Sequence, residues 1–203
     1  MRVYFFILIS LIYLQNNAQN WGDISGNTEL NIQTFQEDSI INAEAREAYV
    51  RNYINLIYNY KNLSIGSRWE LYNNTIPGLT DYEGAGLANK FIQFKNNFID
   101  ITLGNFYDEF GNGLIFRTYY DPNLGVDNSV NGLRLKTNPY QGIYLTAIIG
   151  RQKSYWELSN STLRALNADL LLNEIILKSW SSYVNVGASF VTKKDAYLYG
   201  DII

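Results

Sequence analysis

The stretch Ile24–Thr34, with the sequence ISGNTELNIQT, alternates apolar or small side chains with polar ones. Leu30 and Ile32 are apolar, and the polar Asn31 lies between them. Because successive side chains on a β-strand point to opposite faces, this pattern predicts a strand with one apolar and one polar face. Tyr183–Thr192 shows the same alternation. The two stretches indicate that the chain between them is built from strands.

Composition agrees with an all-β chain. Aromatic residues make up 15% of the sequence, with 17 tyrosines, and only 3 prolines are present. Aromatic residues favour strands, whereas prolines are depleted in them. The leucines of 163–178 also suit a helical period, so a helix is the alternative there. About nine strands are predicted, at residues 24–34, 48–60, 63–72, 87–95, 98–106, 132–137, 142–150, 165–177 and 183–192.

The connections between these strands alternate in length. Short turns are expected at residues 61–62, 96–97, 138–141 and 178–181, and long polar loops at 35–47, 73–86, 107–131 and 151–164. In an up-and-down meander, alternate connections emerge at the same end. Outer-membrane barrels show this asymmetry, with short turns on one side and long loops on the other.

The fold class predicted is therefore an all-β, antiparallel up-and-down transmembrane β-barrel. Bacterial single-chain barrels have an even number of strands, and nine is odd. We therefore expect residues 19–203 to be the N-terminal part of a larger barrel. The alternative is a secreted soluble β-sandwich that binds glycans through its tyrosines.

The N-terminus resembles a secretory signal peptide. Arg2 precedes the apolar run Val3–Leu14, and Ala18 offers a cleavage point. A run of this length is shorter than the ~20 residues that a spanning helix needs. Residues 1–18 are therefore predicted to be a signal peptide, and the outer membrane of a Gram-negative bacterium is the expected location.

The absence of two residue types narrows the possible chemistry. The chain has no histidine, which removes the usual general base and a common metal ligand, and it has no cysteine. Its net charge of −3 gives no basic footprint for nucleic acid. Asp127 and Asn128 offer oxygen ligands, but their spacing matches no EF-hand loop. A non-enzymatic protein without metal or cofactor is expected, and an outer-membrane hydrolase is the less favoured alternative.

The longest connection, 107–131, carries the candidate site. It contains Asp108, Glu109, Arg117 and Asp121, and Arg134 follows on the next strand. Rings of charged side chains set the selectivity of pores. These five residues are predicted to line the lumen or the mouth of the barrel. The alternative is a packed loop in which Arg117 pairs with a carboxylate.

Two glycine-rich stretches in this region carry a resemblance to a known family. They are GNFYDEFGNGLIFRTYYD at 104–121 and LGVDNSVNG at 124–132. The chain resembles an uncharacterised family of Bacteroidetes outer-membrane β-barrel proteins. The resemblance implies location and fold, and it supplies no activity.

The function expected from these observations is that of an outer-membrane barrel. It would act as a porin-like channel or as a structural component of an envelope assembly. Its expected partners are outer-membrane lipid, together with other envelope proteins or small solutes.

Overall fold

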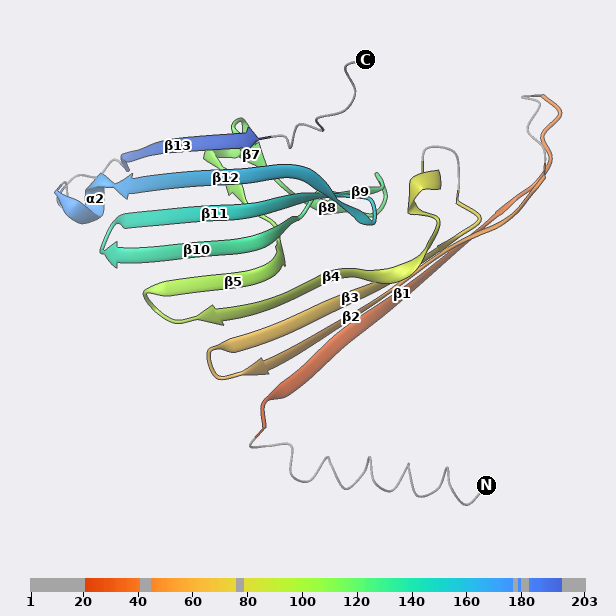
Figure 1. The fold of residues 1–203 in the computed structure, drawn as a ribbon, viewed down its shortest axis with the longest axis horizontal. Helices are drawn as coiled ribbons and strands as arrows, with labels where there is room; N and C mark the ends of the chain where they lie inside the picture. Colours follow the sequence, from red (N-terminus) through yellow and green to blue (C-terminus); the bar gives the residue numbers. More distant parts are fainter. Residues whose placement is uncertain (1–20, 41–44, 76–78, 177–178, 180–182, 195–203) are drawn as a thin grey trace, which may run out of the picture.

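A computed structural model describes residues 21–40, 45–75, 79–176, 179 and 183–194 (Figure 1). The predicted signal peptide, residues 1–18, lies outside the described residues. Among the residues described, no helix is both long enough and apolar enough to cross a membrane.

The described residues form one antiparallel sheet of nine strands, which confirms the all-β prediction. Neighbours in the sheet follow the chain in the order β1-β2-β3-β4-β5-β10-β11-β12-β13. The strands are β1 (Asp23–Phe35), β2 (Arg46–Tyr60), β3 (Leu63–Asn73), β4 (Gly84–Lys95), β5 (Ile99–Phe106), β10 (Val130–Tyr140), β11 (Ile143–Ser154), β12 (Glu157–Leu171) and β13 (Asn185–Lys194).

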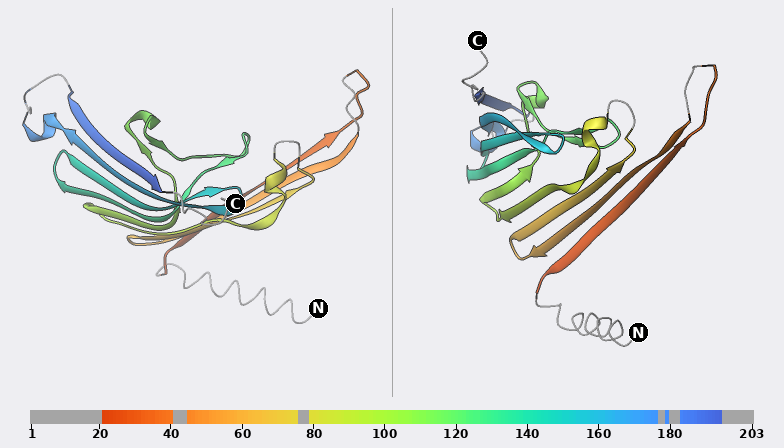
Figure 2. Two further views of the ribbon diagram at one scale, coloured as in Figure 1. Left: turned by 45° about the horizontal axis from the view of Figure 1, so that its top comes forward. Right: turned by 45° about the vertical axis from the view of Figure 1, so that its right-hand side comes forward.

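The sheet is strongly curved and open. Figure 2 shows it as a trough, with the segment between β5 and β10 rising on the concave side. This segment holds two short hairpins, β6 (Glu109–Phe110) with β7 (Phe116–Arg117), and β8 (Tyr120–Asp121) with β9 (Val126–Asp127). The strands β1 and β13 are the two edges of the sheet, so the sheet does not close on itself.

The turn predicted at 138–141 is shorter than expected, since β10 continues to Tyr140 and only Gln141 and Gly142 connect it to β11. Two other connections differ more from the prediction. β11 and β12 are joined by Tyr155 and Trp156 alone, so the long loop expected at 151–164 is wrong. Lys153, Ser154, Glu157 and their polar neighbours hide the strand pattern, because both strands continue past the apolar part of the sheet.

The other difference follows β12. This strand ends at Leu171, and the short helix α2 (Leu172–Ile175) comes next. The alternative prediction of a helix at 163–178 is therefore wrong for most of that range. The strand expected to reach residue 177 is six residues too long, because residues 172–176 lose the alternation of period two. Most of the turn expected at 178–181 lies outside the described residues.

The two faces of the sheet differ sharply in chemistry. We call the concave side the inner face and the convex side the outer face. On β3 the outer face carries the exposed Ile65, Trp69 and Leu71, whereas the inner face carries the buried Arg68 and Glu70. The inner face also buries an apolar cluster that includes Phe106, Val130 and Ile148. On β3, however, the apolar side chains are the exposed ones and the charged side chains the buried ones. This is the reverse of the usual distribution in soluble proteins.

A pair of glycines brings two central strands close together on the inner face. Gly132 of β10 lies directly opposite Gly150 of β11. A Cβ atom added at Gly132 would lie 2.1 Å from the carbonyl oxygen of Ile149 and 2.5 Å from the Cα atom of Gly150. Only glycine fits at this position without moving backbone atoms.

We expect Gly132→Ala to lower the free energy of unfolding by about 1–3 kcal/mol, the usual cost of overpacking. Gly86→Ala is the matched control, because its added Cβ would meet only the Trp156 ring, at an ordinary 3.5 Å. Denaturant titration followed by circular dichroism, with both variants in the same buffer, measures the difference. Equal stability of the two variants would contradict the assigned crowding.

Candidate functional site

Residues 107–129 form a compact segment over the inner face, which we call the inner segment. Hydrogen bonds from backbone amides fold it on itself: the amide of Thr118 donates to the carbonyl of Asp108 at 2.9 Å, and the amide of Tyr119 donates to Oδ1 of Asn128 at 2.6 Å. Gly111, Asn112 and Gly113 all have positive φ angles and make the tip of the first hairpin. Glycine and asparagine tolerate this backbone conformation best.

Asp127 is the point at which the inner segment is fixed to the sheet. Its carboxylate lies 2.6 Å from Nη2 of Arg68 on β3 and 2.8 Å from Nζ of Lys153 on β11. The hydroxyl of Tyr107 donates to it at 2.9 Å, and the amide of Ser129 donates at 3.2 Å. Asp127 is 4% exposed. One buried carboxylate therefore joins three parts of the chain.

The two cations that hold Asp127 have further partners of their own. Nε of Arg68 lies 2.5 Å from Glu70, and the Arg68 guanidinium stacks 3.7 Å from the centre of the Tyr120 ring. Nζ of Lys153 also donates to the carbonyl of Ala88 at 2.8 Å. Two cations and two carboxylates are thus buried together. Buried charges are tolerated when they are paired and hydrogen-bonded in this way.

Burial and charge act in opposite directions on the titrating groups of the inner segment. Burial alone would raise the pKa of Asp127, but Lys153 and Arg68 outweigh it, so this pKa is lowered. Burial raises the pKa of Tyr107, and the Asp127 charge adds to the effect. Burial and the Glu70 charge likewise raise the pKa of Tyr120. Asp127 is therefore an anion and both tyrosines are neutral near pH 7.

A second ionic cluster lies closer to the short turns of the sheet. Asp108 lies 2.8 Å from Nζ of Lys136 and 3.5 Å from Nη1 of Arg134. Arg134 also lies 3.6 Å from Asp100 and donates to the hydroxyl of Thr102 at 3.0 Å. This cluster ties the start of the inner segment to β5 and β10.

The structure divides the five residues that the sequence selected. Asp108 and Arg134 come together on the inner face. Glu109 and Arg117 pair with each other at 3.2 Å across the first hairpin, where both are exposed. Asp121 accepts bonds from the amides of Asn123 and Leu124, at 2.9 and 3.1 Å, and so shapes a turn.

The network around Asp127 was not predicted from the sequence. Arg68 and Glu70 were recognisable as charges on the polar face of a well-patterned strand. Lys153 fell in a region expected to be a loop, and Asp127 was considered only as a calcium ligand. Its carboxylate oxygens face cations instead. Within the described residues, no group of three or more carboxylates is placed to hold a metal ion.

Comparison with known proteins places the chain in a family. The model of a family described as a family of unknown function (DUF6029) matches residues 1–199. The chain belongs to this family. No curated protein and no solved structure matches it. Membership in DUF6029 supports the prediction that the chain belongs to an uncharacterised family, whereas the Bacteroidetes origin and the outer-membrane location stay predictions.

We expect Asp127→Asn to destabilise the protein by about 3–5 kcal/mol, because it leaves buried cations without a full partner charge. Glu109→Gln is the matched control and should cost no more than about 1 kcal/mol, since its ion pair with Arg117 is exposed. Denaturant unfolding measures both variants. Similar losses would show that Asp127 does not anchor the inner segment.

The anchoring should also fail in acid. Because folding lowers the pKa of Asp127, its contribution is complete above the unfolded-state value of about 3.9 and is lost as pH falls through the folded-state value. Pulsed hydrogen exchange should show the inner segment equally protected at pH 7 and pH 5 and deprotected near pH 2. In Asp127→Asn this acid step should be absent. A step of the same size in the variant would assign it to another carboxylate.

Proposed function

We propose that this protein is an outer-membrane β-barrel protein whose outer face contacts lipid and whose polar interior carries small solutes. The observation that supports the proposal is an uninterrupted row of apolar side chains across the outer face. Paired positions on eight consecutive strands contribute to it: Tyr60, Leu63, Phe94, Ile101, Leu135, Ala147, Leu166 and Phe190.

The apolar row is part of a band of a height that suits a membrane. On β3 the outer-face positions from Leu63 to Leu71 span about 27 Å at ~3.4 Å per residue. At a strand tilt of about 40°, this corresponds to a thickness of about 20 Å, close to the ~25 Å apolar band of outer-membrane barrels. Lys90 interrupts the band on β4, and its long apolar stem allows the ammonium to reach toward a polar boundary.

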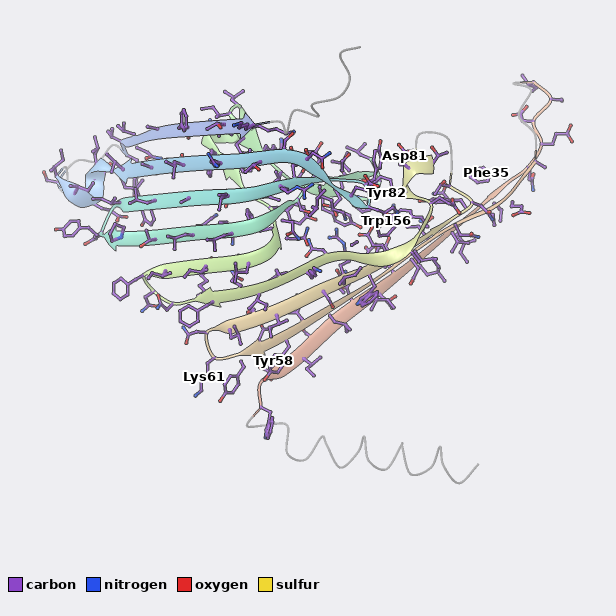
Figure 3. All side chains as sticks on the ribbon, in the orientation of Figure 1. Phe35, Tyr58, Lys61, Asp81, Tyr82 and Trp156 are labelled. Atoms are coloured by element: carbon purple, nitrogen blue, oxygen red, sulfur yellow. The ribbon has the colours of Figure 1, made fainter. Side chains whose placement is uncertain are left out.

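Both boundaries of the band carry the side chains that interfaces favour. On β11 to β13, at the end of the sheet opposite the short turns, the outer face becomes positively charged and carries Arg151, Arg164 and Lys194. Aromatic rings gather at the short-turn end, where Figure 3 labels Tyr58 and Lys61. Aromatic side chains are enriched at membrane interfaces. The exposed ones at this end are Trp21, Tyr60, Phe98, Tyr140 and Tyr183, whereas the exposed Tyr144 lies on the inner face.

The rival architectures account less well for this surface. A soluble β-sandwich would need a second sheet to cover the apolar face, and all nine long strands of the described residues lie in one sheet. Soluble monomers rarely expose apolar patches of more than a few hundred Å². A hydrolase would have to work without histidine, and the buried carboxylates near the inner segment are already paired with cations.

The position of the inner segment indicates what kind of channel the protein would form. It lies on the concave side, where it would occupy the interior of a closed barrel (Figure 2). The clusters at Asp127 and Asp108 hold it against the wall. We infer a narrow, charge-lined path for small polar solutes, in which the inner segment sets the width.

A pair of adjacent substitutions tests the membrane assignment. Leu145 lies on the outer face and Thr146 on the inner face of β11. Arginine at mid-membrane on the lipid face of a barrel costs about 2–4 kcal/mol. We therefore expect Leu145→Arg to reduce the amount of protein in the outer-membrane fraction strongly, and Thr146→Arg to reduce it little. Recovery of the unmodified protein in the periplasm without detergent would contradict the proposal.

Conductance tests the solute path. Phe106 and Val130 are paired neighbours, so a short Gly-Ser linker can replace the residues between them. In planar bilayers we expect small conductance from the unmodified full-length protein and a several-fold larger conductance from the linker variant. If neither the unmodified protein nor the linker variant conducts, the channel function is contradicted and a structural role in an envelope assembly is favoured instead.

A further inference from the structure

A cleft of about 480 Å³ opens at the turn between β11 and β12. We call it the turn cleft. It lies beside the 3-10 helix η2 (Thr80–Tyr82), at the end of the sheet opposite the short turns, where Figure 3 labels Asp81, Tyr82 and Trp156 close together. Its lining is Asp81, Ser154, Tyr155, Trp156, Glu157, Leu158, Ser159 and Asn160.

Tyr155 occupies a turn position whose backbone conformation disfavours tyrosine. Its φ angle is +53°, in the left-handed region where a two-residue hairpin turn usually places glycine or asparagine. The ring nevertheless packs edge-on against Tyr82, with ring centres 4.9 Å apart, and remains 38% exposed. The turn geometry does not call for tyrosine. Strained backbone of this kind concentrates at functional sites.

Trp156 is held rigidly beside it. Its Nε1 donates to the carbonyl of Tyr82 at 2.9 Å, and its ring meets Tyr72 edge-on at 6.2 Å. Tyr72 lies on the inner face of β3, so this aromatic group faces the interior rather than the lipid-side surface. An interfacial membrane contact therefore does not account for the pair Tyr155 and Trp156.

The rest of the turn cleft is polar and partly preformed. Outside the lining, Arg151 fixes three of the lining residues by donating to the carbonyls of Ser159 and Leu158 and to Oδ1 of Asn160. Asp81 and Glu157 are exposed, and within the described residues neither carboxylate has a hydrogen-bond or ion-pair partner. The cleft thus combines an aromatic surface with free hydrogen-bond acceptors.

We propose that the turn cleft binds a neutral oligosaccharide. A pyranose ring has an apolar C–H face, which packs on an aromatic ring, and a rim of hydroxyl groups, which donate to carboxylate and amide oxygens. Tyr155 and Trp156 supply the aromatic surface, and Asp81, Glu157 and Asn160 supply acceptors. The two carboxylates disfavour acidic or sulfated glycans by charge repulsion.

The inference goes beyond the proposed channel and does not depend on it, because the cleft is complete within the described residues. Binding is measured by isothermal titration calorimetry on the full-length protein in detergent, so a failure of membrane insertion does not affect the result. The probes are maltohexaose, cellohexaose, laminarihexaose and mannohexaose. Choline chloride and a heparin hexasaccharide represent cationic and anionic ligands.

Three variants locate the binding. Tyr155→Gly removes the ring and suits the positive φ angle, so the turn keeps its shape. We expect it to weaken binding at least about tenfold. Asp81→Asn should weaken binding about threefold, because the amide keeps one acceptor. Tyr140→Ala, at an exposed tyrosine at the opposite end of the sheet, is the control and should bind as the unmodified protein does.

The proposal holds if at least one neutral hexasaccharide binds, the heparin fragment does not, and Tyr155→Gly weakens binding at least about tenfold while Tyr140→Ala leaves it unchanged. It is overturned if none of the neutral probes binds, or if choline or heparin binds in their place. It is also overturned if Tyr155→Gly binds the saccharide as tightly as Tyr140→Ala does.

Discussion

The concave side of the sheet is its crowded side, and it buries charged side chains such as Arg68 and Glu70 beside an apolar cluster that includes Phe110 and Val130. Alternation along each strand fixes this choice, because moving the apolar set inward would move every charge outward. The rest of the fold follows from the burial of charges on this side. Buried charges must be paired, so Arg68, Asp127 and Lys153 form a network. The inner segment covers this network on the concave side. The outer face is left apolar and uncovered.

Pairing the inner charges has a second consequence. The Asp127 carboxylate accepts bonds from β3, β11 and the inner segment at once, so residues far apart in the sequence become one polar core. A core of this kind gives less stability per contact than apolar packing, since desolvation offsets most of the attraction. Such a core nevertheless fixes a single arrangement of the strands and the inner segment, because each cation has a specific partner. The Asp108 cluster repeats the arrangement at a second point.

The strands and their faces could be predicted from the sequence wherever alternation was clean. β3 is the best example, since Leu63 to Leu71 shows both faces and both are found. Prediction failed where polar residues continue a strand past the apolar band, as at Lys153, and where α2 replaces the end of a strand. The network around Asp127 could not be predicted, because its partners lie 59 and 26 residues away and no local pattern links them. The exposed pair of Glu109 and Arg117 was visible in the sequence, yet it lies outside this network.

Site-directed fluorescence is the most direct test of the proposed contact between the outer face and lipid. The chain has no cysteine, so single cysteines can carry an environment-sensitive dye without removing native thiols. The dye is placed in turn at Leu135 and Leu166 on the outer face and at Lys136 and Asn167 on the inner face, with the protein in vesicles containing brominated lipid. We expect strong quenching at the two leucine positions and little at the other two. Equal quenching on both faces, or none at Leu135 and Leu166, would contradict the proposed contact.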